Sequence, residues 1–469
     1  MTSPANSLKF GTSGLRGLVT DLQGNAARRY TAAFLRYLKE AGTATSGKVY
    51  LARDFRASSP DILADCAAAV TAAGMTPVDC GAVPTPALAL HAMSDASPAI
   101  MVTGSHIPAD RNGLKFYVPT GEISKADEAG ILAALQDDDI DGAGYGAANE
   151  FGAATERYIA RFEPILPIGA LNGLRVGVYE HSTVARDILH RVLRHHGAET
   201  LSLGRRTDFV PVDTEAFGDA IFAPLKAWLD EHELDAIVSA DGDGDRPLLM
   251  DNTGAFVRGD VLGLLTAKFC AAKTVVTPVT SNSAIERTGL FESVVRTRVG
   301  SPYVVAELEG AEGPAIGFEA NGGTFVGQGV LVNGKRLAPL ETRDAVLPIL
   351  AVLGLAAAAK QSVAEIVADL PLQHAVADRL QDVPSEKSGA FLKRLGEDRA
   401  YAEQVFAPHG ISGFSDIDGL QFRTSSGDMV HFRASGNAPE LRVYVEGSTR
   451  ERADELLAWG LQIAAQAVA

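Results

Sequence analysis

Short apolar runs alternate with helical patterns along this chain, and no other feature of the sequence limits the fold as strongly. Residues 48–52 (KVYLA) have the pattern of a strand, and a helical pattern over 60–73 follows, ended by a glycine. A second strand pattern over 99–102 precedes another helical pattern over 125–135. Strands that alternate with helices are typical of α/β proteins, so we expect an α/β fold.

This alternation restarts along the chain, which predicts several domains. Residues 174–179 (LRVGVY) begin a second series of strands and helices, and strands near 274–279 and 314–318 belong to a third. From about 371 onward, strand patterns follow one another before a final helix, as in an α+β domain. A chain of 469 residues has room for several domains. We predict the divisions 1–150, 151–255, 256–370 and 371–469.

The charge and the cysteine content argue against several classes of protein. The formal net charge of −16 disfavours binding to nucleic acid or to an anionic membrane, although a local cationic cleft for an anionic substrate is compatible with it. Cys66, Cys80 and Cys270 have no metal-ligand spacing and predict a reducing, cytoplasmic location. No secretory signal is expected from the first ten residues. The longest apolar stretch, 345–359, is too short to span a membrane and is interpreted as a buried helix.

Three aspartates follow a predicted strand in the segment DGDGDR. Asp241, Asp243 and Asp245 are separated by glycines, so their carboxylates can converge on one hard cation such as Mg²⁺, which prefers oxygen ligands. An EF-hand loop begins similarly but needs Gly at its sixth position and Glu at its twelfth, where this chain has Arg246 and Asn252. The alternative is an ordinary Asp/Gly turn, which leaves the repulsion between three carboxylates uncompensated.

The segment RASGNAPELR near the carboxyl end concentrates hydrogen-bond donors for an oxyanion. Each of its two guanidiniums can clamp an oxyanion with paired bonds, and backbone N–H groups near a glycine can form a concave nest. The pattern predicts a phosphate site, and the alternative is a solvated β-turn with surface arginines. The candidate residues are Arg433, Ser435, Gly436, Asn437 and Arg442.

Three further segments carry polar residues next to glycine or at a strand end. In GFEANGG, the carboxylate of Glu319 and the amide of Asn321 suit vicinal sugar hydroxyls, and the alternative is a hairpin turn beginning at Asn-Gly. FGTSGLRG holds one cation, Arg16, and is not specific by itself. Residues 53–59 (RDFRASS) are interpreted as a strand-to-helix turn with a serine that caps the helix.

The loop TGSHIPADRNGLKFY, after the second predicted strand, concentrates the most chemistry. Ser105 and His106 are adjacent, and Asn112-Gly113 is expected to turn the chain back so that Lys115 reaches the same place. A Ser-His-Asp hydrolase fits poorly, because sequence neighbours do not naturally face each other and Gly-X-Ser-X-Gly is absent. A serine that carries a phosphoryl group fits better, since open α/β sheets bind ligands at the carboxyl ends of their strands. The alternative is a plain loop with a capping serine.

Together, five of these segments resemble the α-D-phosphohexomutase superfamily of phosphomannomutases, phosphoglucomutases and phosphoglucosamine mutases. FGTSGLRG is similar to the opening motif, GSHIPADRNGLK to the phosphoserine loop and DGDGDR to the metal loop. GFEANGG is similar to the sugar-binding loop and RASGNAPELR to the phosphate-binding loop. The resemblance spans nearly the whole chain in the family's order. It implies three related α/β domains with mixed sheets and a smaller carboxy-terminal α+β domain, arranged around a central cleft.

The resemblance also implies a mechanism. Phosphorylated Ser105 would exchange its phosphoryl group with a hexose 1- or 6-phosphate through a bound hexose 1,6-bisphosphate, which also acts as activator. Mg²⁺ would be held by the phosphoserine and the three aspartates of DGDGDR. Lys115, Arg16 and Arg246 would offset the negative charge of two phosphate groups. RASGNAPELR would hold the phosphate that is not transferred, and GFEANGG would bind the sugar hydroxyls.

The chain departs from the family pattern at several positions. Ile107 stands where the phosphoserine loop usually has Asn, and Asn321 and Gly323 stand where the sugar loop usually has Ser and His. Ser301 stands where the third domain often has a second His. Both histidines are candidates for proton transfer in better-known members, so this role must rest on other residues here. The remaining candidates are Lys115 and Arg16, followed by His106.

The choice of sugar depends on the same two loops. The sugar loop differs from the Glu-Gln-Ser-Gly-His form of many phosphoglucosamine mutases, and the phosphoserine loop resembles that of bacterial phosphomannomutases. We therefore expect an intramolecular phosphotransferase for mannose phosphate that acts as a monomer or homodimer. The alternatives with the same mechanism are a phosphoglucomutase, which comes next, and a phosphoglucosamine mutase. The alternative of another class is a phosphosugar-binding protein without turnover, because both histidines are missing. A Mg²⁺-dependent phosphatase would use the same metal loop, but this chain lacks an Asp-X-Asp nucleophile motif near its start.

Overall fold

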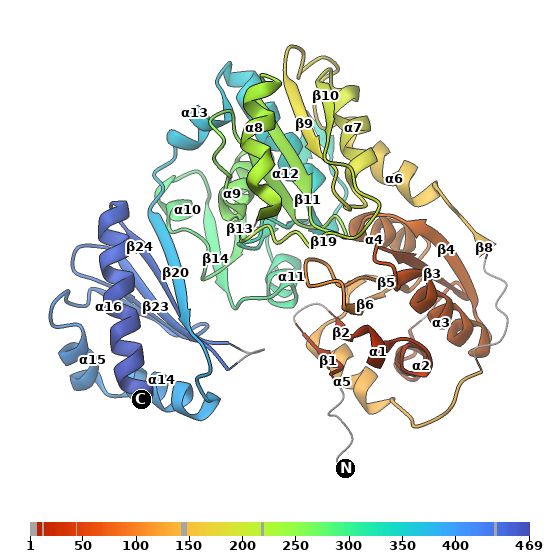
Figure 1. Cartoon of the computed structure of the whole chain (residues 1–469), viewed down its shortest axis with the longest axis horizontal. Helices are drawn as coiled ribbons and strands as arrows, with labels where there is room; N and C mark the ends of the chain where they lie inside the picture. The colour runs from red at the N-terminus through yellow and green to blue at the C-terminus, as the bar shows by residue number, and fades with distance from the viewer. Residues whose placement is uncertain (1–6, 12–13, 44, 142–147, 217–219, 436–438) are drawn as a thin grey trace. The chain divides into compact units, whose positions relative to one another are not determined.

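The computed structural model describes residues 7–11, 14–43, 45–141, 148–216, 220–435 and 439–469. The chain divides into two compact units, Met1–Val276 with Gly300–Val367, and Thr277–Val299 with Ala368–Ala469. The first two α/β sheets and most strands of a third belong to the first unit, whereas the carboxy-terminal sheet belongs to the second (Figure 1). The finer division into four domains stays a prediction.

The first sheet is mixed and has the order β1-β2-β6-β5-β3-β4-β8, with β7 paired to β6. β3 pairs in parallel with β4 and β5, whereas β6 runs antiparallel to β5 and β2. Its strands are β1 (Lys9–Phe10), β2 (Leu15–Leu18), β3 (Lys48–Arg53), β4 (Thr76–Ala82), β5 (Ala99–Val102), β6 (Arg111–Val118), β7 (Gly121–Glu122) and β8 (Ala148–Asn149). The helices of this region are α1 (Val19–Leu22), α2 (Asn25–Glu40), α3 (Ser59–Ala72), α4 (Thr85–Ser94), α5 (Lys125–Ala133) and α6 (Ala153–Phe162).

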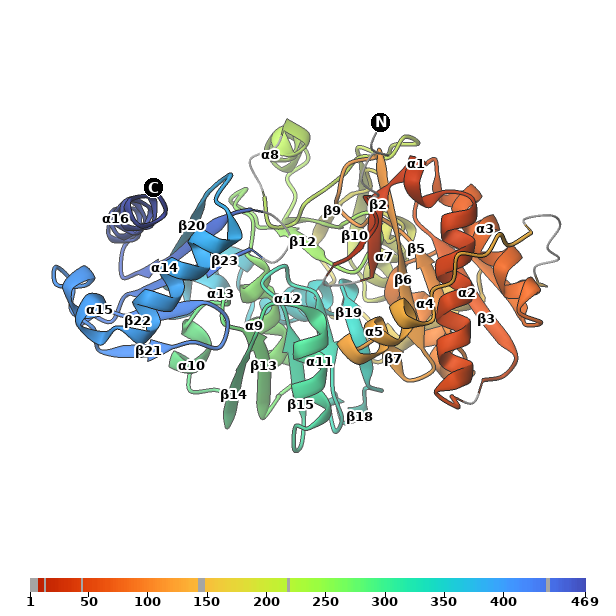
Figure 2. The same ribbon diagram turned by 90° about the horizontal axis from the view of Figure 1, so that it is seen from below.

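Helices α2 and α3 lie side by side against this sheet (Figure 2). Their apolar faces supply Phe34 and Ile62 to a buried core that also includes Leu51 of β3 and Phe116 of β6. The Phe34 and Phe116 rings lie 4.9 Å apart between centroids, a close aromatic contact. This packing fixes the central strands, and therefore the loop that connects β5 to β6.

The second and third sheets repeat the same layered plan. The second runs β10-β9-β11-β12, parallel except for β12. In the third, β13 and β15 are parallel, and β16 and β19 follow antiparallel. The second sheet and its helices are β9 (Arg175–Tyr179), β10 (Glu199–Leu203), β11 (Ala236–Ala240), β12 (Pro247–Met250), α7 (Arg186–His195), η1 (Ala220–Phe222) and α8 (Ala223–Glu231). The third region contains β13 (Thr274–Pro278), β15 (Ala315–Phe318), β16 (Thr324–Val326), β17 (Leu331–Val332), β18 (Lys335–Arg336), β19 (Leu340–Asp344), α9 (Gly259–Phe269), α11 (Ser301–Glu309), α12 (Val346–Ala359) and α13 (Val363–Ala368).

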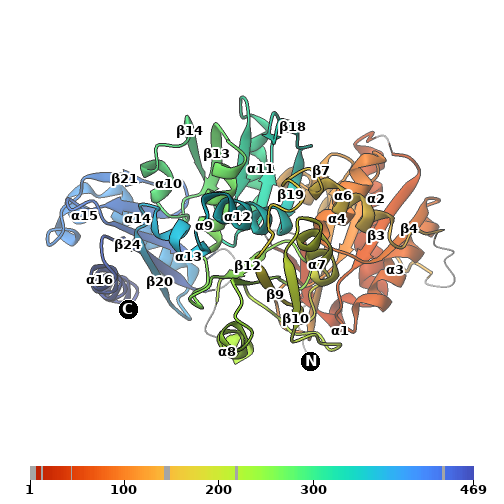
Figure 3. The same cartoon turned by 90° about the horizontal axis from the view of Figure 1, so that it is seen from above.

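The predicted buried helix over 345–359 is α12, and it packs beside α9 (Figure 3). It is apolar nearly all round, which is typical of a helix enclosed by the protein. Among the helices in the described ranges, none is long and apolar enough to cross a membrane.

The second unit is built on an antiparallel sheet of order β20-β24-β23-β22-β21. The long helix α16 packs along β20 and β24, and Phe391 and Phe432 meet edge to face in the core at 5.4 Å. The strands of this sheet are β20 (His374–Leu380), β21 (Gly413–Ser415), β22 (Leu420–Arg423), β23 (Met429–Ala434) and β24 (Leu441–Gly447). The residues of this unit also include β14 (Ser293–Thr297), the edge strand of the third sheet. The helices are α10 (Ala284–Arg287), α14 (Ser385–Glu397), α15 (Arg399–Val405) and α16 (Arg450–Val468).

One predicted turn is wrong. Asn112 and Gly113 lie inside the strand β6, so they do not reverse the chain. The reversal between β5 and β6 is made earlier, by the loop that contains Ser105. Asn112 is not available for a local turn, because its Nδ2 donates to the hydroxyls of Ser58 and Ser59 at 2.9 and 3.0 Å. Lys115 still reaches the expected place, as a residue of β6.

Candidate functional site

Three of the predicted functional loops begin at equivalent places in the first unit, directly after β5, β11 and β15. The first of them holds Ser105 in the left-handed region, with φ of 53°, which is uncommon for a residue other than glycine. The backbone N–H of Ser105 donates to the Thr103 hydroxyl at 2.8 Å. Such a conformation is costly and persists only where the surroundings hold it in place.

Arg56 supports the Ser105 loop through hydrogen bonds to its backbone, a role that the sequence interpretation missed. Its side chain is buried, and its Nε donates to Asp54 Oδ2 at 3.2 Å. The rest of the guanidinium donates to backbone carbonyls of the loop, those of Ser105 (3.0 Å), Ile107 (2.6 Å), Pro108 (2.7 Å) and Arg111 (3.0 Å). The predicted serine cap is also wrong, since Ser58 makes no capping bond and instead accepts a bond from Asn112.

Replacing Arg56 by methionine is expected to lower the free energy of unfolding by about 3–5 kcal/mol, because Asp54 would remain buried without its cation. The Ser105 loop would also lose its support. Arg53→Met is the matched control, since within the described residues the Arg53 side chain makes a single hydrogen bond, to the Asp54 carbonyl at 3.3 Å. Urea unfolding measures both variants, and an equal loss in the two would contradict a supporting role for Arg56.

The second loop brings three carboxylates together. Asp241, Asp243 and Asp245 follow β11, are fully buried, and offer ligand oxygens that all lie within 4.8 Å of one another. Asp241 Oδ2 accepts a hydrogen bond from the Ser105 hydroxyl at 2.5 Å. Gly242 makes this approach possible, because a Cβ there would lie 2.8 Å from the Ser105 carbonyl oxygen.

The hydrogen bonds of these carboxylates suit a cation. Asp243 and Asp245 each accept from Lys115 Nζ through Oδ2, at 2.6 Å in both cases. Within the described residues, the other oxygen, Oδ1, of each of these two carboxylates is buried and accepts no hydrogen bond. Buried polar atoms are rarely left unpaired. The residues present therefore fit a hard divalent cation such as Mg²⁺, held by carboxylate oxygens.

The pKa shifts of the loop also favour a bound cation. Burial, and then the charges of Asp243 and Asp245, raise the pKa of Asp241 well above its usual range. Burial acts to raise the pKa of Asp245 as well, but Arg343, Lys115 and Arg246 lower it overall. Burial alone would lower the pKa of Lys115, yet Asp243 and Asp245 raise it. Lys115 is thus a fixed cation between two carboxylates. A second cation would offset the repulsion that Asp243 and Asp245 exert on the Asp241 carboxylate.

The three acid–base candidates differ in what they can do. His106 Nδ1 lies 3.3 Å from the Ser105 hydroxyl oxygen, but burial and the charges of Arg246 and Arg16 lower the pKa of His106 to about 2. A neutral imidazole with so low a pKa is a poor proton acceptor. Burial and Arg246 lower the pKa of Arg16 to about 10, so Arg16 remains a cation. Lys115 has the best position, since its ammonium is bonded to two of the clustered aspartates.

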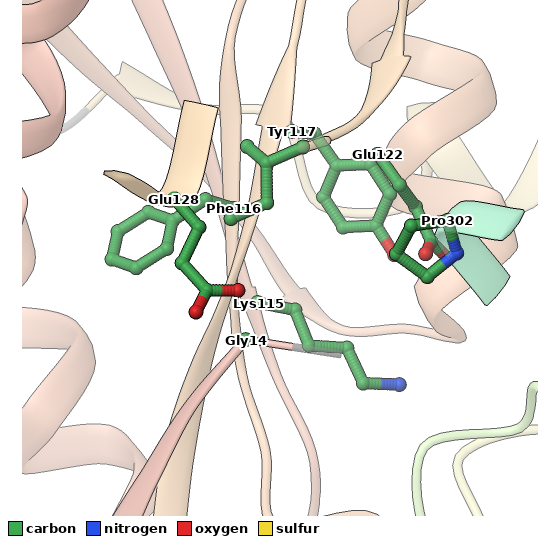
Figure 4. Close-up of a pocket in the computed structure, with 8 residues that line it drawn as sticks. Gly14, Lys115, Phe116, Tyr117, Glu122, Glu128 and Pro302 are labelled. Atoms are coloured by element: carbon green, nitrogen blue, oxygen red, sulfur yellow. The ribbon is translucent and has the colours of Figure 1, made fainter. Parts of the chain in front are cut away.

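A small pocket opens beside Lys115 on β6. Figure 4 shows its lining, with Tyr117 and Glu122 close to Pro302 and Lys115 extending from the neighbouring part of the strand. Tyr117 hydrogen-bonds the Thr342 hydroxyl at 3.2 Å, and Glu122 accepts from the same hydroxyl at 2.8 Å. These contacts connect β6 to β19, the strand that precedes α12.

The third loop is a hairpin between β15 and β16, as the alternative interpretation of GFEANGG stated. Glu319 Oε2 accepts from Arg343 at 2.8 Å, and both side chains are buried. Asn321 uses its Oδ1 to accept from the Gly323 N–H at 2.9 Å. Arg343 is a second residue that the sequence interpretation missed. The only sequence signal was a charged pair, Arg343-Asp344, between two apolar runs.

The predicted phosphate-binding segment lies in the second unit. Arg433 on β23 and Arg442 on β24 are directly opposite each other in the sheet register. Like charges in such a pair repel each other, but each guanidinium also has an acidic partner. Arg433 pairs with Asp418 at 2.8 Å, and Arg442 pairs with Glu440 at 3.1 Å. Ser435 donates its N–H to the Glu440 carbonyl at 2.9 Å. The remaining candidates, Gly436 and Asn437, lie outside the described residues.

Comparisons with known proteins agree with this arrangement. The families described as phosphoglucomutase/phosphomannomutase alpha/beta/alpha domains I, II and III match residues 7–140, 156–254 and 258–374, and that family's C-terminal domain matches 373–458. A phosphomannomutase of Sinorhizobium fredii (strain NBRC 101917 / NGR234) is 48% identical over 467 residues, 97% of this chain and 98% of the relative. A phosphomannomutase of Salmonella muenchen is 41% identical over 457 residues, 96% and 94% of the two chains.

A solved structure supports the fold. The phosphoglucomutase/phosphomannomutase family protein of Burkholderia thailandensis superposes with a TM-score of 0.78 at 21% identity, covering 97% of both chains. This chain belongs to the phosphoglucomutase/phosphomannomutase family, within the α-D-phosphohexomutase superfamily. Membership confirms the predicted α/β architecture with a carboxy-terminal α+β domain, and it confirms the predicted enzyme class, a phosphohexomutase.

Proposed function

We propose that this enzyme interconverts mannose 1-phosphate and mannose 6-phosphate, with glucose phosphates as the next-best substrates. The observation that carries the proposal is the hydrogen bond of 2.5 Å from the Ser105 hydroxyl to Asp241, one of three buried aspartates. The preference for mannose is supported by the two relatives above, which are named phosphomannomutases and match this chain nearly end to end.

In the proposed cycle, the enzyme carries a phosphoryl group on Ser105. The P–O bond to Ser105 Oγ breaks as a new bond forms to the free hydroxyl of the hexose phosphate, and the proton of that hydroxyl is passed to Ser105 Oγ, which becomes a hydroxyl again. The hexose 1,6-bisphosphate then reverses its orientation, and its other phosphoryl group returns to Ser105 Oγ. Lys115, followed by Arg16, is the proposed relay for this proton: the cation gives a proton to Ser105 Oγ and regains one from the sugar hydroxyl, so it keeps its charge, while His106 contributes through its contact with Ser105.

Mg²⁺ is the proposed cofactor, held by Asp241, Asp243, Asp245 and the phosphorylated Ser105. When bound, it neutralises charge on the phosphoryl group that is transferred. Phosphoserine and a sugar phosphate each carry about −1.5 to −2 charges near neutral pH, so the approach of two such groups needs cations. The chain's own cations proposed for this purpose are Lys115, Arg16 and Arg246.

The remaining site residues bind the parts of the substrate that do not react. We assign the sugar hydroxyls to Glu319 and Asn321. We assign the phosphate that is not transferred to the second unit, through Arg433, Ser435, Gly436, Asn437 and Arg442. Hexose 1,6-bisphosphate is the proposed activator, because it reloads Ser105. A cytoplasmic location is part of the proposal and is supported by three free, buried cysteines, and the enzyme is proposed to act as a monomer or homodimer.

Ranking three substrates tests the sugar preference. With bisphosphate activator and Mg²⁺, kcat/KM for mannose 1-phosphate is expected to exceed that for glucosamine 1-phosphate by about 10-fold or more, with glucose 1-phosphate between them. Formation of each 6-phosphate is followed by chromatography. A higher kcat/KM for glucosamine 1-phosphate would contradict the preference. Tight binding of all three sugars without any product would instead favour a binding protein without turnover.

A further inference from the structure

Arg343, near the end of β19, joins two loops that are far apart in the sequence. Its Nε donates to Asp245 Oδ2 at 3.0 Å and its Nη1 donates to Glu319 Oε2 at 2.8 Å. The arginine is 2% exposed and the two carboxylates are buried with it. A guanidinium is a planar fork with fixed donor directions, so it sets the orientation of both carboxylates at once.

Gly323 leaves the space that this arginine fills. A Cβ at position 323 would lie 2.4 Å from Cδ and 2.6 Å from Cγ of Arg343, closer than real carbon atoms approach. Gly323 also closes the sugar loop, since its carbonyl accepts from the Glu319 N–H at 3.1 Å. A side chain at position 323 would therefore push Arg343 away from the loop that it holds.

The residues on either side of Arg343 are anchored. Asp344 Oδ1 accepts hydrogen bonds from the first N–H groups of α12 at 2.8 and 3.2 Å. The Thr342 hydroxyl donates to Glu122, whose other oxygen accepts from Ser301 at 2.8 Å (Figure 4 shows Glu122). The backbone at Arg343 is thus fixed from two directions, which is what a residue needs in order to position others.

We propose that Arg343 is a positioning residue that couples the sugar loop to the metal loop. By holding Oε2 of Glu319, it leaves the carboxylate's other oxygen to accept a sugar hydroxyl. By sharing Oδ2 of Asp245 with Lys115, it leaves Oδ1 for the divalent cation. The sugar half of this inference rests on the proposed function, whereas the metal half does not.

Arg343→Met tests both halves with separate measurements. The dissociation constant of Mg²⁺, measured by calorimetry without sugar, is expected to rise about 10–100-fold, as is typical when a partner of a metal ligand is removed. The KM for mannose 1-phosphate should rise by about the same factor. Arg28→Met is the matched control, since Arg28 is a half-buried guanidinium that pairs with Asp65 at 2.6 Å between α2 and α3 and, within the described part of the chain, bonds to neither loop nor β19. It should lose thermal stability with both constants unchanged.

Gly323→Ala is the second variant, because it keeps the guanidinium but obstructs its place. Both constants are expected to rise in it, by up to about 10-fold. If Arg343→Met does not fold, the Mg²⁺ dissociation constant and the KM of Gly323→Ala test the inference instead. Unchanged Mg²⁺ affinity and KM in a folded variant at either position would overturn the inference, and would leave Arg343 a purely structural residue. A wild-type enzyme without mutase turnover would instead refute the proposed function, while the Mg²⁺ measurement would still test Arg343.

Discussion

Ser105→Ala is expected to lower mutase turnover by at least about 10⁴-fold, since removal of a nucleophile that acts as part of a unit typically costs this much or more. The variant keeps every backbone bond of its loop, including those that Arg56 donates to the carbonyls. It loses only the hydroxyl that is bonded to Asp241. Coupled assays of 6-phosphate formation measure the loss, and thermal unfolding should show that the variant is folded.

Ser182→Ala is the matched control. Ser182 is also a buried serine shortly after a strand, β9, but its hydroxyl bonds to the backbone of Val210 instead of to the aspartates. The control should keep its turnover. Turnover of Ser105→Ala within about tenfold of the wild type would mean that Ser105 does not carry the phosphoryl group.

Removing the divalent cation is expected to have the second-largest effect. Charge stabilisation by a catalytic metal contributes several kcal/mol to the transition state, so chelation should lower turnover by about 10³-fold or more, and Mg²⁺ should restore it. Asp243→Asn should lower turnover by a similar factor without chelation. The substitution removes one of the three carboxylates, which is also one of the two that pair with Lys115. The measurement is turnover as a function of Mg²⁺ concentration.

Asp251→Asn controls for the loss of a buried aspartate. Asp251 follows the strand β12 and bonds to its own turn at Thr253 and Ala255, so it shares the burial of Asp243 but not the cluster. We expect lower stability and an unchanged Mg²⁺ requirement. An enzyme that keeps full turnover after chelation would contradict the assignment of the three aspartates to a cation.

The strands and the metal loop could be predicted because their signals are local. The strand predicted over 99–102 agrees with β5, and the predicted final helix is α16, since apolar periodicity marks elements buried in a sheet or against one. The three aspartates are neighbours on one loop, so their convergence needs no knowledge of the tertiary structure. Burial of the whole loop could not be predicted, and it is burial that raises the pKa of Asp241.

Residues that act across the fold could not be predicted in the same way. Arg56 and Arg343 are ordinary surface-type residues in a sequence, and their roles depend on partners 49 and 98 positions away, at Ser105 and Asp245. Asn112 was expected to turn the chain, because Asn-Gly is a strong local signal for a turn. Its tertiary bonds to two serines of the helix α3 region outweigh that local preference.

In the proposed cycle, one hydroxyl accepts and returns a phosphoryl group beside a cluster of aspartates. The most direct test is mass spectrometry of the peptide that contains Ser105, first after incubation with a hexose 1,6-bisphosphate and Mg²⁺, and then after addition of excess mannose. We expect a phosphate on Ser105 that persists with mannose, which has no phosphate for the second unit to hold. This phosphate should exchange when labelled mannose 1-phosphate is added. A peptide that never carries phosphate, or one phosphorylated at another residue while turnover proceeds, would contradict it.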